Sequence, residues 1–514
     1  MLLTLLTILT VLILLAGYDV LQRRNSILRN FPVVGHLRFL LEGLGPELRQ
    51  YIVTSNNEER PFSRGQREWI YGMAAGHGGY VGFGTDAEVE LAPNYVVVKH
   101  AAFPLPRPQA DEDVVPCAKV LGAARGRAKA FRPASVVNVS AMSFGSLSAP
   151  AIEAIDRGCA EAGCLHNVGE GGLSPYHLQG ADLIYQIGTG YFGCRTSDGR
   201  FDLARLVTLT EAHPIRAIEI KLSQGAKPGL GGVLSAVKVT DEIAAIRGIP
   251  LGRDCVSPSA HSAFGDVDGL LDFVETVADA TGLPVGIKSA VGEQDFWDKL
   301  VTEMASGARG VDFVTVDGGE GGSGAAPMTF CDHVAFPFKI AFSRVYRTFA
   351  EAGLADRVVF VASGKCGLPD TALLAVVLGA DLVHVAREAM MAIGCIQAQR
   401  CQSGHCPAGV ATQSRWLARG LDPAIKSVGL AGYVSGLRHE LLQLARACGV
   451  PHPALVTTDQ IEVLDGKFGS LPVSELFGYP LDWGLPAEPD RVEIGALMAG
   501  LVSGAGANRE HSTR

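Results

Sequence analysis

The chain has 514 residues, of which 47% are hydrophobic and 19% are charged, and its formal net charge is −9. This length allows about two to four domains, or a large barrel in one piece, and the apolar content is ample for a large core. A mildly acidic chain lacks the strong basic patch that nucleic-acid binding requires, so we expect no nucleic-acid partner. Most of the eleven cysteines are scattered, which is typical of a protein from a reducing compartment.

The N-terminal residues 1–18 form an apolar run without a charged side chain. This run is at the lower limit of length for a helix that spans a membrane. A cleaved signal peptide would carry a basic segment before the run, whereas Arg23, Arg24, Arg29 and Arg38 all follow it. Because positive charge marks the cytoplasmic side, we expect a single-pass membrane anchor over 1–18 with its N-terminus outside and the bulk of the chain in the cytoplasm. Cleavage and peripheral attachment are the alternatives.

Residues 19–130 are expected to form a juxtamembrane and wrapping segment rather than a separate domain. Within it, residues 31–52 mix apolar and basic positions, as a helix that lies near the membrane face does. An ordinary amphipathic helix packed on the main domain explains this pattern equally well. Residues 53–130 are polar and are interrupted by proline and glycine.

From Ser135 onward, short β-branched runs alternate with stretches rich in alanine and leucine. Such runs, separated by helices, indicate parallel βα units, and eight of them favour an α/β fold with a closed (β/α)8 TIM barrel over an open doubly wound sheet. We expect the barrel over residues 131–413 and a C-terminal helical extension over 414–514. The eight runs are 136–143, 165–171, 183–188, 215–223, 284–292, 311–319, 357–365 and 382–388.

Polar residues stand at the ends of these runs, where the active site of a barrel is built. Buried charge is costly without partners, so a core role explains them poorly. Four glycine-rich segments lie beside them, at 141–148, 167–177, 220–232 and 316–327. A tight βα turn explains any one segment, but four together favour a bound cofactor, because glycine lets the backbone approach a flat ring or a phosphate. The polar residues are Ser143, Glu170, Gln186, Lys221, Lys288, Asp317, Lys365 and Arg387.

Three cysteines, Cys395, Cys401 and Cys406, stand within twelve residues after the eighth run. Clustered thiolates suit zinc, copper(I) or an iron–sulfur cluster. Structural zinc usually takes four ligands, and the nearby candidate His405 is the immediate neighbour of Cys406. Three thiolates therefore fit a [3Fe-4S] cluster better.

Six motifs occur in one order along the chain: AMSFGSLS, NVGEGG, EIKLSQGAKPGLGG, VSPSAHS, DGGEGGSGAAP and C-x5-C-x4-C-P-x-G-x-A-T-Q. In these motifs the chain resembles the FMN-binding synthase domain of glutamate synthase over residues 100–445. The resemblance implies a TIM barrel that binds FMN and a [3Fe-4S] cluster. It also implies that electrons pass through the cluster to FMN, which then reduces the 2-iminoglutarate formed from 2-oxoglutarate and ammonia.

The resemblance assigns catalytic roles to three residues and the cluster to the three cysteines. Glu170 would handle protons at the imine, and its alternative role is to cap the glycine turn. Lys221 and Gln224 match a pair close to flavin and substrate, where a lysine supplies a compact positive charge. Lys227 either belongs to this group or is solvated. Cys395, Cys401 and Cys406 match the cluster ligands.

The resemblance also assigns residues to FMN. Ser143 and the amides around Gly145 would touch the isoalloxazine, Gln186 would donate to the ring or act as a core amide, and Lys288 would contact the flavin or form a structural ion pair. The phosphate is expected beyond the seventh and eighth strands. There the chain departs from the family, because SGKCG replaces a glycine pair and Arg387-Glu388 replaces small residues, while Lys365 and Arg387 compensate by charge. The residues expected at the phosphate are Gly364, Gly367 and Arg387.

The large synthases carry modules that we do not expect in this chain. No cysteine precedes Cys117, so glutamine hydrolysis by an N-terminal cysteine is not expected, and no dinucleotide-binding fingerprint stands in the required context. Nitrogen would come from ammonia or a glutaminase partner, and electrons from an external donor protein or a membrane carrier. The favoured hypothesis is an oxidoreductase acting on CH–NH2 groups that reductively aminates 2-oxoglutarate or a related 2-oxo acid. The alternatives are a flavin-dependent amino-acid dehydrogenase or N-alkylglutamate synthase-like enzyme, and a redox-inert membrane-tethered barrel.

Overall fold

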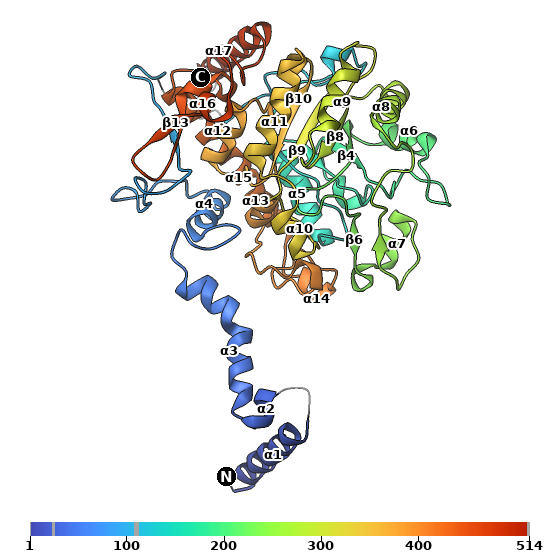
Figure 1. The fold of residues 1–514 in the computed structure, drawn as a ribbon, viewed down its shortest axis with the longest axis vertical. Coiled ribbons are helices and arrows are strands. Elements are labelled where there is room, and N and C mark those ends of the chain that lie inside the picture. The colour runs from blue at the N-terminus through green and yellow to red at the C-terminus, as the bar shows by residue number, and fades with distance from the viewer. Residues whose placement is uncertain (1, 23–25, 107–112, 511–514) are drawn as a thin grey trace. The chain divides into compact units, whose positions relative to one another are not determined.

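The computed structural model describes residues 2–22, 26–106 and 113–510 (Figure 1). The chain divides into two compact units, Met1–Glu68 and Trp69–Arg514. Arg23 and Arg24, which the sequence places beside the membrane anchor, lie outside the described residues, as does the side chain of Arg29.

The first unit contains α1 (Leu2–Leu21), α2 (Ser26–Asn30), α3 (Gly35–Leu48) and the π-helical turn η1 (Arg49–Val53). By length and composition α1 could cross a membrane, with a hydropathy of 2.1 and only 6% of its apolar window buried, although a signal sequence would show the same features. At its end, the Asp19 carboxylate accepts hydrogen bonds from the Val33 amide at 2.9 Å and from His36 Nε2 at 3.0 Å. These bonds connect the end of α1 to α3 and to the turn before it.

In the second unit, eight parallel strands form a closed barrel, and they follow one another around it in chain order. The last strand pairs with the first, with Val383 beside Val137. Each of the eight predicted runs contains one of these strands, so the predicted (β/α)8 barrel is confirmed. The strands are β2 (Val137–Val139), β3 (His166–Asn167), β4 (Leu183–Ile187), β5 (Ile215–Lys221), β8 (Val285–Ser289), β9 (Phe313–Asp317), β10 (Val359–Ser363) and β11 (Leu382–Val385).

Helices surround the barrel, and two small sheets lie outside it. α5 shows how the sequence sets their ends: the Ser148 hydroxyl caps its first turn and Gly163, with φ +66°, ends it. The boundary between the two units falls within α4 (Arg64–Ala74). The other helices of this unit are α5 (Ala149–Ala162), α6 (Leu203–Ala212), α7 (Asp241–Arg247), α8 (Val267–Thr281), α9 (Asp295–Met304), α10 (Met328–His333), α11 (Phe338–Glu351), α12 (Pro369–Val377), α13 (Arg387–Ala392), α14 (Arg415–Ala418), α15 (Pro423–Ala447), α16 (Val473–Phe477) and α17 (Glu488–Glu510). The remaining strands are the pair β6 (Val233–Leu234) and β7 (Cys255–Val256), and the sheet of β1 (Val96–Val98), β12 (Ile461–Leu464) and β13 (Ser470–Pro472).

Residues 117–131 close the N-terminal end of the barrel. Cys117, Leu121 and Phe131 belong to one buried apolar cluster with inward-facing strand residues such as Phe313 and Leu382. Beside this cluster, the Lys119 ammonium lies 3.1 Å from the Asp381 carboxylate, and both side chains are buried. With this end filled, any ligand pocket of the barrel belongs at the other end, where the strands finish.

α15 lies where the eighth helix of a barrel is expected. It packs against α5, α12 and α13, and Arg438 on it donates a 2.8 Å hydrogen bond to the Ala162 carbonyl at the end of α5. The predicted boundary at residue 413 therefore separates α15 from the barrel it covers. Residues 393–422, which include the three cysteines, form a long connection between α13 and α15.

Candidate active site

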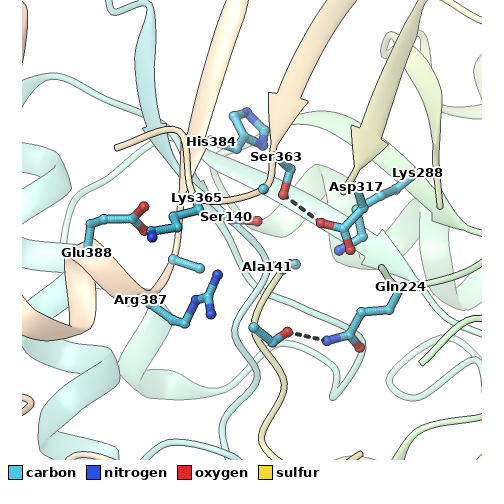
Figure 2. Close-up of a pocket in the computed structure, with 14 residues that line it drawn as sticks. Ser140, Ala141, Gln224, Lys288, Asp317, Ser363, Lys365, His384, Arg387 and Glu388 are labelled. Atoms are coloured by element: carbon cyan, nitrogen blue, oxygen red, sulfur yellow. Dashed lines mark hydrogen bonds between the residues drawn. The ribbon is translucent and has the colours of Figure 1, made fainter. Parts of the chain in front are cut away.

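A pocket lies at the C-terminal ends of the barrel strands (Figure 2). Its wall comes from residues at or after the ends of β2, β5, β8, β9, β10 and β11, so chain segments far apart in sequence meet there. This is the end at which the sequence predicts the site. The lining residues are Ser140, Ala141, Gln224, Lys288, Asp317, Gly321, Gly322, Ser363, Gly364, Lys365, His384, Ala386, Arg387 and Glu388.

Three cations and two carboxylates line the pocket. In Figure 2, Lys365, Arg387 and Glu388 lie on one side, and Lys288 and Asp317 lie on the other. The Asp317 carboxylate accepts hydrogen bonds from the Ser363 hydroxyl and the Gly225 amide, both at 2.8 Å, and the Glu388 carboxylate accepts one from the Gly367 amide at 3.2 Å. Because protein donors already engage both carboxylates, the excess of cations suits an anionic ligand.

Glycine backbone forms part of the pocket wall. Gly364 has φ +148°, and a β-carbon there would lie 3.0 Å from Phe338 Cβ. A β-carbon on Gly322 would lie 2.9 Å from Arg387 Cδ. A wall of this kind admits a flat ring or a phosphate close to the backbone.

Glu170, Lys221 and Gln224 are brought together beside this pocket. The Lys221 ammonium donates hydrogen bonds to Glu170 Oε1 at 2.7 Å and to Gln224 Oε1 at 3.2 Å. The Gln224 amide nitrogen in turn donates to the Gly322 carbonyl in the pocket wall at 2.8 Å. A β-carbon on Gly188 would lie 2.7 Å from Glu170 Cβ, so glycine is needed there to seat the carboxylate.

Lysines fix the charge state of Glu170. Burial alone would raise the pKa of its carboxyl group, but Lys221, with smaller contributions from Lys227 and Lys288, lowers that pKa to about 2. Burial and the neighbouring Lys221 lower the pKa of Lys227. Glu170 is therefore ionised at neutral pH, and it accepts hydrogen bonds rather than donating a proton.

Beneath the pocket, the barrel interior holds a charged residue that the sequence analysis did not select. Glu219 is fully buried, and its carboxylate accepts hydrogen bonds from Asn167 at 2.8 Å, Gln186 at 2.6 Å and Thr315 at 2.7 Å. Burial raises the pKa of Glu219, but Lys288 foremost lowers it, so that the net shift is downward. The predicted flavin ligand Gln186 thus donates to Glu219. In sequence, Glu219 could be found from its inward register in β5, two residues before Lys221.

Three other predicted cofactor ligands lie outside the described pocket lining. The Ser143 hydroxyl lies 3.4 Å from Arg247 Nη2, the Gly145 carbonyl accepts a hydrogen bond from Gln413 at 3.1 Å, and the Gly367 carbonyl accepts one from Tyr433 at 2.7 Å. The segment that contains Ser143 instead contributes its neighbours Ser140 and Ala141 to the pocket. Of the predicted set, Lys288, Gly364 and Arg387 line it together with Gln224.

Residues 393–422, the cysteine segment, are hydrogen-bonded to the loop that follows β2. The Ser148 hydroxyl donates to the Gly409 carbonyl at 2.7 Å, and Gln413 donates to the Leu147 carbonyl at 2.8 Å. The buried Lys238 bridges the same two segments, because its ammonium donates to the Ser146 carbonyl at 3.2 Å and to the Cys401 carbonyl at 2.7 Å. The cysteines therefore lie near the loops that build the pocket.

The three cysteines provide the soft donors that an iron–sulfur cluster takes. Cys401 and Cys406 are close enough for their charges to interact: burial raises the pKa of the Cys401 thiol and Cys406 raises it further. Across the described part of the chain, however, no three histidine, cysteine or acidic side chains converge on one point that could hold a metal ion. The chemistry of the three thiols therefore fits an iron–sulfur cluster, whereas their positions in this structure do not converge on one site.

The model of a protein family described as the conserved region in glutamate synthase matches residues 118–451. Among curated proteins, the chain is 36% identical to the "glutamate synthase large subunit-like protein YerD" of Bacillus subtilis, covering 85% of this chain and 89% of that protein. It is 34% identical to the "archaeal glutamate synthase [NADPH]" of Methanocaldococcus jannaschii, covering 61% of this chain and 59% of that protein. The chain thus spans well under two thirds of the archaeal relative.

Solved structures also resemble the chain, at low sequence identity. A mandelate oxidase is 16% identical with a TM-score of 0.42, covering 77% of this chain and 95% of that protein. A flavocytochrome b2 is 14% identical with a TM-score of 0.45, covering 86% of this chain and 89% of that protein.

Proposed function

Because the chain belongs to the glutamate synthase family, whose conserved region matches residues 118–451, we propose that it is an FMN-dependent oxidoreductase that acts on CH–NH2 groups. Its reaction would be the reductive amination of 2-oxoglutarate, or a related 2-oxo acid, to the amino acid. The observation that carries this proposal is the hydrogen-bonded group of Glu170, Lys221 and Gln224 at the edge of a cation-rich pocket.

The pocket residues fit FMN in shape and charge. Lys365 and Arg387 supply cations for the phosphate, and the glycine backbone at Gly364 allows its close approach. Lys288 is suited to the edge of the ring that becomes anionic on reduction. Bound FMN would supply the hydride that reduces the imine carbon.

The chain's own residues would bind and orient the substrate. Lys221 and Lys227 offer positive charge to the carboxylates of a 2-oxo diacid. The ionised Glu170 accepts a hydrogen bond from the imine nitrogen and favours its protonated form, because a carboxylate stabilises a neighbouring positive charge. In balance, the oxo acid, ammonia, two electrons and two protons give the amino acid and water.

Electrons and nitrogen would come from outside the chain. We propose an external donor protein or a membrane carrier as the electron source, with Cys395, Cys401 and Cys406 holding a [3Fe-4S] cluster. The soft thiolate donors support this assignment, although the three thiols do not converge on one point in the described part of the chain. Nitrogen would arrive as ammonia or from a glutaminase partner.

The N-terminal helix would attach the enzyme to a membrane. The length and hydropathy of α1 support a single-pass anchor. The arginines that follow the apolar run in sequence support an N-terminus outside and a cytoplasmic barrel.

The decisive experiment is anaerobic reoxidation of the purified full-length protein. The protein should show flavin absorption bands with a broad iron–sulfur shoulder, and after chemical reduction 2-oxoglutarate with ammonium should reoxidise it. Either compound alone is the matched control and should not. Reoxidation by a different 2-oxo acid, or only with an alkylamine, would identify a different substrate. A protein that binds no flavin after reconstitution would reject the proposal and leave a redox-inert barrel.

A further inference from the structure

One lining residue of the pocket has a buried polar atom without a partner. His384 lies on β11 and is only 3% exposed, and it forms part of the pocket wall. Its Nε2 is buried and has no hydrogen-bond partner within the described part of the chain. A buried polar atom left unpaired costs free energy, so such atoms in folded proteins usually have a partner. The His384 ring also lines the pocket, so a ligand bound there would contact the imidazole.

The charges around His384 determine which kind of ligand group it can meet. Burial lowers the pKa of the His384 imidazole, Glu219 opposes this and Lys288 adds to it, and the resulting pKa is about 4. The ring is therefore neutral at neutral pH, with one nitrogen that donates and one that accepts. A neutral imidazole suits a hydroxyl, a carbonyl or a ring nitrogen rather than a phosphate.

Within the pocket, the neutral imidazole of His384 lies apart from the two cations that suit a phosphate group. In Figure 2, Lys365 and Arg387 lie together on one side, and His384 lies apart from them, above Ser140. Phosphate prefers cationic donors, so the Lys365 and Arg387 side is the one that suits the phosphate of FMN. His384 is left for the uncharged part of the same molecule.

We propose that His384 hydrogen-bonds the riboflavin moiety of FMN in this pocket and recognises it independently of the phosphate. This inference rests on the proposed FMN site and adds a binding residue that neither the motifs nor the strand-end pattern indicates. Its side chain is positioned by β11, which pairs with β10 on one side and β2 on the other in the closed barrel.

The test compares FMN with riboflavin on the full-length protein freed of flavin, using quenching of flavin fluorescence to measure each dissociation constant. His384→Leu removes the hydrogen bond. It should raise the dissociation constants of both flavins by the same factor, roughly 10-fold, as expected for one hydrogen bond. Arg387→Leu is the matched control, and it should weaken FMN while leaving riboflavin nearly unchanged. The ratio of the two dissociation constants is the readout, and it does not depend on turnover.

Each outcome of this comparison supports or overturns the role proposed for His384. Unchanged binding of both flavins by His384→Leu would overturn the inference, and so would a loss confined to FMN, because His384 would then act on the phosphate. If the wild type binds neither flavin, the proposed function itself fails. Should His384→Leu not fold, His384→Gln, which keeps a donor and an acceptor, allows a second measurement. In 15N-histidine spectra of the wild type, riboflavin should shift one imidazole resonance that is missing from His384→Gln. A spectrum without such a shift would overturn the inference.

Discussion

The ammonium of Lys221 lies 2.7 Å from Glu170 Oε1, although 51 residues separate them in the chain. Lys221 ends β5 and Glu170 follows β3, so the closed barrel is what makes them neighbours. Glu170 therefore keeps a negative charge among lysines at the mouth of the barrel, and the consequences of that charge can be measured.

Replacing Glu170 with Gln removes that negative charge, and it leaves Lys221 without its carboxylate partner and Lys227 without a neighbouring negative charge. We expect kcat to fall by about 100-fold or more, the typical effect of losing one electrostatic group of an active site, while the bound flavin per chain is unchanged. Glu320→Gln is the control, because its carboxylate contacts the Phe338 amide at 2.8 Å rather than the lysines. Equal activity in the two variants would contradict the assigned role.

The pH profile tests the charge state of Glu170 separately. Because its pKa is lowered to about 2, the carboxylate remains ionised across the usual assay range. No loss of kcat/KM between pH 8 and pH 5 should come from its protonation. A decrease of kcat/KM in that pH range that occurs in the wild type and not in Glu170→Gln would show that Glu170 titrates there.

Replacing Glu219 with Gln should destabilise the barrel. The variant removes the carboxylate charge that acts on the buried Lys288 ammonium, and an uncompensated buried charge costs about 3–5 kcal/mol. Thr315→Val removes one hydrogen bond to the Glu219 carboxylate and should cost less, about 1.5–3 kcal/mol. The folded-state pKa of Glu219 is lowered, so its stabilising contribution is complete above its ordinary pKa near 4.5 and declines as the pH falls through the folded value. Urea unfolding midpoints should show a gap between wild type and Glu219→Gln that narrows in acid.

Replacing Cys401 with Ser should abolish the iron–sulfur signal in electron paramagnetic resonance and the steady-state activity, while most of the FMN remains bound. The exposed Cys331 provides the control, since Cys331→Ser should retain both signals. Loss of FMN and of fold together with the cluster signal would instead show that the cysteine segment acts mainly in structure.

Replacing Leu12 with Arg tests the membrane anchor. Arginine near the middle of a spanning helix costs about 2.5–3.5 kcal/mol in insertion, so the variant should appear in the soluble fraction after carbonate extraction while the wild type stays with membranes. Leu12→Ile keeps the apolar character and should behave as the wild type. An N-terminus removed from the mature wild-type chain, detected by mass spectrometry, would contradict the anchor.

The barrel was predictable because its strands are buried on both faces. Such strands appear as short β-branched runs, and even the short run that became β4 (Leu183–Ile187) has all of its residues buried. Strand order followed from the rule that sequential parallel strands lie side by side. The grouping of Glu170, Lys221 and Gln224 at one end followed from the same topology.

The interior of the barrel was less predictable. Glu219 lies in β5 between apolar neighbours, and its role depends on donors from β3, β4 and β9 that only the closed barrel assembles. The same contacts place Gln186 against Glu219, an arrangement that strand-end position alone does not reveal. Backbone register decided a third case, because Ser140 and Ala141 line the pocket while Ser143 and Gly145 lie beyond it.

The packing contact between α15 and α5, called the seam below, sets the order in which a nascent chain can finish folding. Arg438 and Ala162 are joined across 276 residues, and Gly158 on α5 leaves room for Leu430, since a β-carbon there would lie 2.8 Å from Leu430 Cβ. Contacts between such distant positions form late, because the closure of a long loop must precede them. During synthesis the cysteine segment emerges before α15, so this side of α5 stays uncovered while the thiols are already outside the ribosome. Cluster delivery before the seam closes would need no reopening of the folded barrel.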